Sequence, residues 1–182
     1  LKLLAERPVT KLNLSDSNLD DSMISDLINL PLTYLNLSGT KISDTGFENI
    51  LKVKNLDFLN LLECDLLSEK CLEEVSKLEK LKVLTLGRNL VTDRTLEYLS
   101  RCRSLDGIDA SHSNITEKGL RSLAKLKSLR LLILEQNPHL GPASLDIIEK
   151  DLRQLRSLNL NMSDLTEADL AKLARALKLH ML

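Results

Sequence analysis

Apolar residues recur along the chain in a triplet of the form Leu-x-x-Leu-x-Leu, in which polar or variable residues separate the members. The copies begin at residues 9, 32, 56, 81, 105, 129 and 155, so successive copies are 23 to 26 residues apart. A fixed period in this range is typical of proteins built from stacked repeats. The copies are Val9-Leu12-Leu14, Leu32-Leu35-Leu37, Leu56-Leu59-Leu61, Leu81-Leu84-Leu86, Leu105-Ile108-Ala110, Leu129-Leu132-Leu134 and Leu155-Leu158-Leu160.

The copy that begins at Leu32 predicts a strand, a turn and a helix. Leu35-Asn36-Leu37-Ser38 alternates between apolar and polar residues, as in a short strand with one buried face. Phe47, Ile50 and Leu51 have helical spacing, and Ser43-Asp44 is a suitable N-cap followed by an acidic residue. The same cap recurs at Thr92-Asp93, Thr116-Glu117 and Thr166-Glu167. Because every repeat has this order, successive strands are expected to be parallel.

The turn after each strand has a regularity of its own. The residue three positions after the last strand residue of the triplet is small in almost every copy: Ser17, Thr40, Cys64, Asn89, Ser113, Asn137 and Ser163. Backbone groups in a buried turn need hydrogen-bond partners. We expect these side chains to bond to amides of neighbouring turns, which gives Cys64 a structural role.

These residues match the leucine-rich-repeat consensus, Leu-x-x-Leu-x-Leu-x-x-Asn/Cys-x-Leu, over essentially the whole chain. Ile42-Ser-Asp-Thr-Gly-Phe47 and Ile115-Thr-Glu-Lys-Gly-Leu120 resemble the helix start of ribonuclease-inhibitor-like repeats and of the cysteine-containing repeats of F-box proteins. The resemblance implies an α/β fold, a leucine-rich-repeat solenoid (horseshoe) of about seven repeats. It also implies a parallel β-sheet on the concave face, α-helices on the convex face, and use in protein binding.

Residues 1–182 are expected to form a single leucine-rich-repeat domain that is a segment of a longer protein. Leu1-Lys-Leu-Leu-Ala-Glu6 has the character of the end of a preceding helix, and Leu177-Lys-Leu-His-Met-Leu182 resembles the start of another strand. A solenoid needs a polar cap at each end, and neither segment is an evident one. The alternative is that both segments are themselves imperfect caps.

The residues between the strand leucines are expected to point to the concave face. Tyr34, Phe58, Leu62 and Val83 form a predicted apolar cluster on adjacent strands, with Arg88 at its edge. Aromatic and Arg side chains are enriched at binding hot spots, and an exposed apolar patch is typical of an interface. Strand propensity alone would also favour Tyr, Phe and Val here. Leu131 and Ile133 form a predicted second patch, and the alternative is that a flanking segment covers it.

Charge and composition exclude several classes of function. The formal charge is -1, so no global field attracts nucleic acid or anionic lipid, and no apolar run is long enough to span a membrane. The three Cys lie inside repeats, which favours a reducing compartment. Acidic residues at helix starts and basic residues at helix ends complement the helix dipoles, although a docking role for the basic rim is an alternative.

No metal-ligand spacing, phosphate-binding loop or catalytic constellation is present in the sequence. We therefore expect a non-enzymatic, intracellular and cytoplasmic module that binds a protein partner through the concave sheet. We expect no cofactor, metal, nucleic acid, membrane or small-molecule substrate. The alternatives are the substrate-recognition segment of an F-box-type ubiquitin ligase, which the resemblance alone suggests, and a structural subunit of a large assembly.

Overall fold

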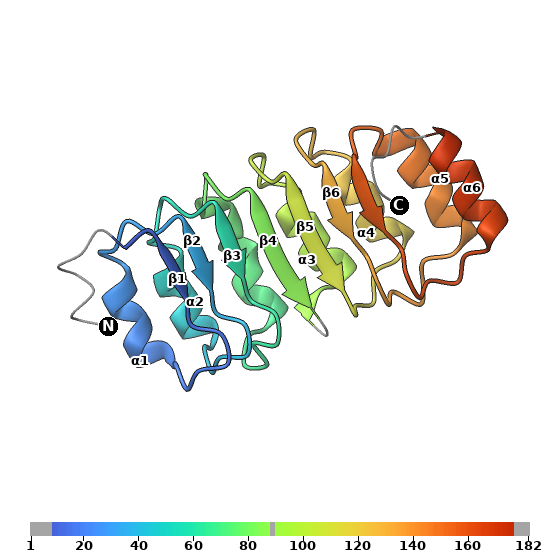
Figure 1. The fold of residues 1–182 in the computed structure, drawn as a ribbon. Coiled ribbons are helices and arrows are strands. Elements are labelled where there is room, and N and C mark those ends of the chain that lie inside the picture. Colours follow the sequence, from blue (N-terminus) through green and yellow to red (C-terminus); the bar gives the residue numbers. More distant parts are fainter. Residues whose placement is uncertain (1–8, 88–89, 177–182) are drawn as a thin grey trace.

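Short strands lie side by side in one parallel sheet, and the helices pack along one face of this sheet (Figure 1). The computed structural model describes residues 9–87 and 90–176. The sheet has seven strands in the order of the chain, from β1 to β7. They are β1 (Lys11–Asn13), β2 (Tyr34–Asn36), β3 (Phe58–Asn60), β4 (Val83–Gly87), β5 (Gly107–Ser111), β6 (Leu131–Ile133) and β7 (Ser157–Asn159).

The strand register brings equivalent residues of successive repeats together. Leu35 pairs with Leu59, Leu59 with Leu84, and this correspondence continues through the sheet. From the second copy to the sixth, every member of the apolar triplet is at most 1% exposed. Val9, Leu12 and Leu14 of the first copy are partly buried against this core. The predicted α/β leucine-rich-repeat solenoid with a parallel sheet is therefore confirmed, whereas the predicted end segments 1–6 and 177–182 lie outside the described residues.

Each strand is followed by a helix. The helical elements are α1 (Asp21–Ile24), η2 (Ser25–Leu27), α2 (Asp44–Ile50), η3 (Glu69–Lys77), α3 (Asp93–Leu99), α4 (Glu117–Leu123), α5 (Pro142–Asp151) and α6 (Glu167–Ala176). The predicted caps are confirmed, since the side chains of Ser43, Thr92 and Thr116 each accept a hydrogen bond from an amide in the first turn. In η3 the helix is of the 3-10 type. Its buried residues Leu72 and Val75 are three apart, which suits three residues per turn.

The acidic residue that begins a helix also holds the next helix in place. Asp93 Oδ1 accepts a bond from the Thr116 amide at 2.8 Å, and Asp93 Oδ2 accepts one from the Thr116 hydroxyl at 2.6 Å. Asp21 bonds to Ser43 and Asp44 bonds to Ser68 in the same two-fold way, and Glu69 accepts a bond from the Thr92 hydroxyl. The sequence-based explanation by helix dipoles is therefore incomplete, because these carboxylates join neighbouring caps into a ladder.

This ladder explains the glycine of the Ser/Thr-Asp/Glu-x-Gly helix start. A Cβ atom on Gly46 would collide with the Asp21 carboxylate, and one on Gly119 would lie 2.5 Å from Asp93 Oδ1. The amide of Gly119 donates to that same oxygen at 3.1 Å. The glycine is therefore needed because the carboxylate of the preceding repeat occupies the space of its side chain.

The ladder is interrupted at α5, which begins with Pro142 after Gly141 and has no acidic residue in its first turn. The next cap, Thr166, is held by its own helix: its amide and hydroxyl both donate to Asp169 Oδ2, at 3.0 and 2.6 Å. The Asp169 amide returns a bond to the Thr166 hydroxyl. Thr166 and Asp169 thus form a capping box with Asp in place of Glu, and it replaces the missing carboxylate of the preceding repeat.

The side chains of the turn after each strand donate mainly to carbonyl oxygens. Ser17, Thr40 and Ser163 donate to the last strand leucine of their own repeat, whereas Cys64 Sγ reaches back to Leu37 O. Asn137 accepts a bond from the amide of a neighbouring turn, that of Ile115, at 3.3 Å. The predicted bond to an amide is confirmed for Asn137. Asn89 lies outside the described residues.

One residue in each described turn has a left-handed backbone, and the sequence analysis did not find this column. The φ angles are 56° at Asp16, 67° at Gly39, 58° at Glu63, 53° at His112, 54° at Gln136 and 55° at Met162. A residue other than glycine in this conformation costs about 1–2 kcal/mol. The turn therefore requires this conformation whichever residue stands there.

The ladder predicts that Gly46→Ala destabilises the protein when residue 21 is Asp but not when residue 21 is Ala. In an exposed helix, Gly→Ala normally stabilises by about 0.5–1 kcal/mol. We expect Gly46→Ala to lower the free energy of unfolding by about 1–3 kcal/mol in the native chain, because the Cβ would displace the Asp21 carboxylate. In an Asp21→Ala background, the same change should be neutral or stabilising. Urea unfolding of the four proteins measures this, and equal losses in both backgrounds would contradict the ladder.

Candidate functional site

The face of the sheet that the helices leave uncovered carries an aromatic pair. Tyr34 of β2 and Phe58 of β3 are directly opposite each other in the strand register. Their rings are stacked, with centroids 4.4 Å apart and an interplanar angle of 7°. Both side chains are half-buried, so one side of the pair faces solvent. Such pairs contribute about 0.5–1.5 kcal/mol beyond area burial, and the pair therefore has a fixed orientation before any partner arrives.

The apolar row continues across the sheet beyond the aromatic pair. Val83 of β4 is opposite Phe58, and Gly107 of β5 separates Val83 from Leu131 of β6. A Cβ atom on Gly107 would lie 3.4 Å from Val83 Cγ2 and 3.5 Å from Leu131 Cδ2, so these side chains converge over the glycine. We call Tyr34, Phe58, Val83 and Leu131 the sheet-face row. It spans five strands and unites residues that the sequence analysis divided between two patches.

Two other predicted site residues, Leu62 and Ile133, lie outside the sheet-face row. Leu62 follows the end of β3, and its Cδ1 occupies the space over Gly87 where a Cβ would stand. It is four residues from Phe58, which corresponds to about 13 Å along an extended chain. Leu62 therefore packs on the neighbouring strand end, apart from the row. Ile133 is half-buried in the adjacent column, between Asp109 and Asn159. Arg88 lies outside the described residues.

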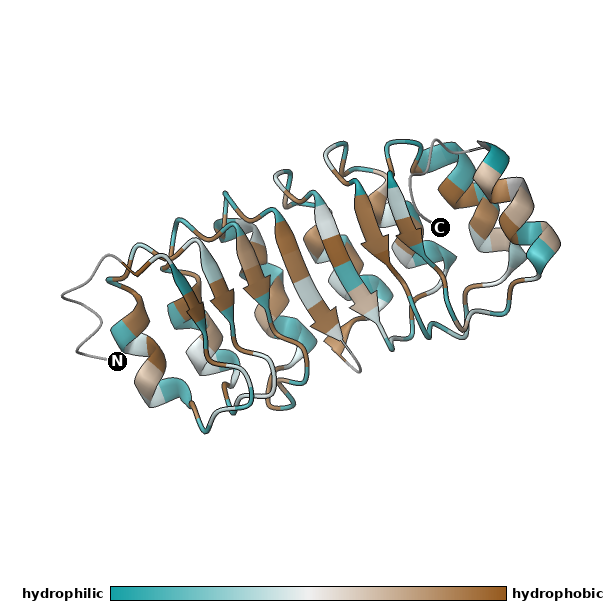
Figure 2. Ribbon diagram, viewed as in Figure 1, coloured by the Kyte–Doolittle hydropathy of each residue, from teal (hydrophilic) through white to brown (hydrophobic). Residues whose placement is uncertain are grey.

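The polar column next to the row has a structural task. Asn36, Asn60 and Asn159 each accept a bond from the amide two residues later, at 2.8–3.0 Å, and Asn13 and Asp109 do the same. These bonds end the strands and fix the side chains. The sequence analysis placed the residues between the strand leucines on the concave face but missed the role of this column; the recurrence of Asn or Asp at the same register was the available signal. In Figure 2 the three residues of β6 are all coloured as apolar, since Ile133 replaces the polar residue there.

The cysteines are placed as structural thiols. Cys64 and Cys102 are buried and Cys71 is half-buried, and none of them forms a disulfide. Burial raises the pKa of the Cys102 thiol to about 12, and burial together with the nearby Asp44 carboxylate raises the pKa of Cys71. Raised pKa values keep these groups protonated at neutral pH, where the thiolate is the reactive form. Within residues 9–87 and 90–176, no three side chains of His, Cys, Asp or Glu are grouped to hold a metal ion.

The described helices include none that is long and apolar enough to cross a membrane. Asn36 and Asn60 flank the aromatic pair on one side, whereas Asp57 and Lys82, which directly precede Phe58 and Val83 in the chain, form an ion pair. Lys11 is the residue opposite Tyr34 at the first strand. The arrangement thus provides a rigid, extended apolar strip with a polar border, and it suits contact with another molecule's surface rather than enclosure of a small one.

Comparison with known proteins gives a fold relationship. No protein-family model and no curated protein sequence matches the chain. Among solved structures, the chain is similar to internalin C2 from Listeria monocytogenes str. 4b F2365, with 22% identity, a TM-score of 0.57, and coverage of 87% of this chain and 71% of that one. An internalin F from the same strain aligns with 20% identity and a TM-score of 0.47, over 87% of this chain and 63% of that one. The first similarity supports a leucine-rich-repeat solenoid and leaves the ribonuclease-inhibitor-like and F-box subtype unconfirmed.

Proposed function

We propose that this chain is a non-enzymatic module that binds a protein partner through the uncovered face of its sheet, with the sheet-face row as the contact. The observation that carries the proposal is the stacked, half-exposed Tyr34–Phe58 pair. The buried triplets form the core side of the strands, and these aromatic rings lie on the other side of the same strands. Their position therefore favours recognition.

Two features of the row support this proposal. The row is continuous over Gly107, so a partner could contact apolar surface on five neighbouring strands. The Asn side chains beside it are held by backbone amides, so they lose little conformational freedom when a partner binds. Aromatic anchors surrounded by a polar border are the usual arrangement of binding hot spots.

The proposed compartment is intracellular. Its support is the use of cysteine: the three thiols lie within the repeats, and two of them are buried among the leucines of the core. Secreted domains more often pair their cysteines as disulfides. We also propose that the chain needs no cofactor and no small-molecule substrate. The support for this is the shape of the sheet-face row, which forms an open strip and not a pocket.

The proposal predicts that partner binding depends on the aromatic pair. Tyr34→Ala and Phe58→Ala should each weaken the affinity for the partner by about tenfold or more, since truncating a hot-spot residue costs about 2 kcal/mol or more and about 1.4 kcal/mol is tenfold. Their free energies of unfolding should change by only about 1 kcal/mol, because both rings are half-exposed. Quantitative mass spectrometry of proteins captured from the source cells measures the first effect, and urea unfolding measures the second.

Leu66→Ala is the matched control, because Leu66 is a large apolar side chain that is 60% exposed away from the sheet-face row. Proteins retained by Leu66→Ala and lost from both aromatic variants are the predicted partners. An identical captured set for all variants would refute binding through this face. If one partner stays bound at fixed stoichiometry through purification, the chain is a structural subunit of a larger assembly. If subunits of a ubiquitin-ligase scaffold are captured, the chain is the substrate-recognition segment of an F-box-type ligase.

A further inference from the structure

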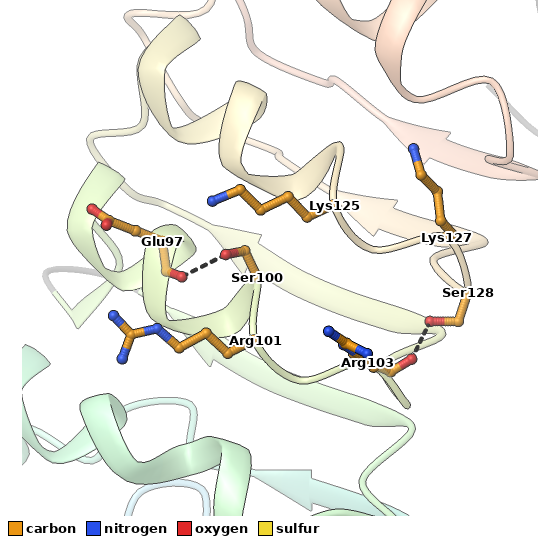
Figure 3. Close-up of a pocket in the computed structure, with 7 residues that line it drawn as sticks. All are labelled: Glu97, Ser100, Arg101, Arg103, Lys125, Lys127 and Ser128. Atoms are coloured by element: carbon orange, nitrogen blue, oxygen red, sulfur yellow. Dashed lines mark hydrogen bonds between the residues drawn. The ribbon is translucent and has the colours of Figure 1, made fainter.

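A second surface lies on the helix side, where the ends of α3 and α4 and the loops after them enclose an open hollow of about 700 Å³ (Figure 3). Four cationic side chains line it, Arg101, Arg103, Lys125 and Lys127, with Glu97 as the one acidic group. The loops that carry them are tied together, since the Ser128 hydroxyl donates to the Arg103 carbonyl at 2.8 Å. Arg101 is further held over the Tyr98 ring, 5.6 Å from its centroid.

The same hollow occurs two repeats earlier with a different charge. Between α2 and η3 it is lined by Lys52, Lys54 and Lys77 together with Glu48 and Glu74. Lys77 forms an ion pair with Glu74. The helix caps align these two places residue by residue: Lys52 and Lys54 correspond to Arg101 and Arg103, and Lys77 corresponds to Lys125.

One carboxylate of the earlier hollow is missing from the later one, which also has one cation more. Ser122 stands at the position of Glu74, and Lys127, which lines the later hollow, stands at the position of Glu79, which does not line the earlier one. In the described part of the chain, Arg103 and Lys125 consequently form no ion pair with a carboxylate. The later hollow therefore has three more positive than negative groups, whereas the earlier one has one more.

Helix dipoles do not account for this difference. Cations near a helix C-terminus are stabilising, and the Lys54 and Lys127 ammonium groups each donate to a carbonyl at the end of a helix. Both hollows lie beside such helix ends, however, and the earlier one has Glu74 where the later one has Ser122. The excess positive charge therefore distinguishes the hollow at α3 and α4 from the one at α2 and η3.

We propose that this hollow, lined by Arg101, Arg103, Lys125 and Lys127, binds an acidic segment of a protein, in which several Asp or Glu side chains follow one another. Each lining cation is exposed, and one exposed ion pair is worth only about 1 kcal/mol or less. Useful affinity therefore requires several carboxylates at once. The formal charge of the whole chain is -1, so no global positive field favours the long phosphate row of a nucleic acid.

Fluorescence anisotropy with a fluorescein-labelled hexaglutamate peptide tests this proposal, with hexaglutamine as the uncharged probe and a short duplex DNA as competitor. We expect hexaglutamate to bind, and its affinity to fall at least about tenfold when the salt concentration rises from about 0.05 to 0.5 M. Arg103→Gln combined with Lys125→Gln should weaken binding by about fivefold or more. Lys54→Gln combined with Lys77→Gln, at the equivalent positions of the earlier hollow, is the matched control and should change it by less than about twofold.

Three results would overturn the proposal. The first is that hexaglutamate binds no more tightly than hexaglutamine. The second is that the control double variant loses as much affinity for hexaglutamate as the test double variant. The third is that the DNA displaces the peptide at a phosphate concentration below the carboxylate concentration at which unlabelled hexaglutamate does so. Circular dichroism melting of both double variants verifies that they are folded. Because all four substitutions lie on the helix side, the result is independent of binding through the sheet-face row.

Discussion

The structure depends on the burial of equivalent leucines against one another in successive repeats. Leu35, Leu59 and Leu84 occupy the same place in neighbouring strands and are fully buried. A single repeat could not bury its apolar side, so each one is stable only between neighbours. This requirement fixes the parallel register, and the register in turn places Tyr34 against Phe58 and one helix cap against the next. Both proposed binding surfaces are consequences of this stacking.

The stacking also produces polar contacts that stabilise the fold, as the buried leucines do. Carboxylates at the helix starts bond to the cap of the following helix, and Asn side chains close the strand ends. A typical hydrogen bond of this kind contributes about 0.5–1.5 kcal/mol net to stability. The polar residues that repeat with the leucines are thus largely structural. Those that break the repeat, such as Ser122 and Lys127 at the positions of two glutamates, stand out as candidates for function.

Much of the fold could be predicted from the sequence because it depends on residues close together in the chain. The buried triplets and the caps at Ser43, Thr92 and Thr116 required only spacing and residue type. The candidate site was predicted less well, because it depends on contacts between repeats. The direction in which Leu131 leans over Gly107, and Leu62 over Gly87, follows from the neighbouring backbone and not from strand alternation. The Asp21 carboxylate, which occupies the space where a Cβ of residue 46 would stand, likewise belongs to a different repeat from Gly46.

The central claim is that each strand has one side that maintains the fold and another that is free for recognition. Neighbouring residues of β4 test it most directly: Leu84 is fully buried, whereas Val83 is half-buried on the sheet-face row. Urea unfolding should show that Leu84→Ala lowers the free energy of unfolding by about 3 kcal/mol, since it leaves a cavity in the core. Val83→Ala should lower it by less than about 1 kcal/mol. Equal losses from the two substitutions would contradict the account, because the uncovered face would then be part of the core.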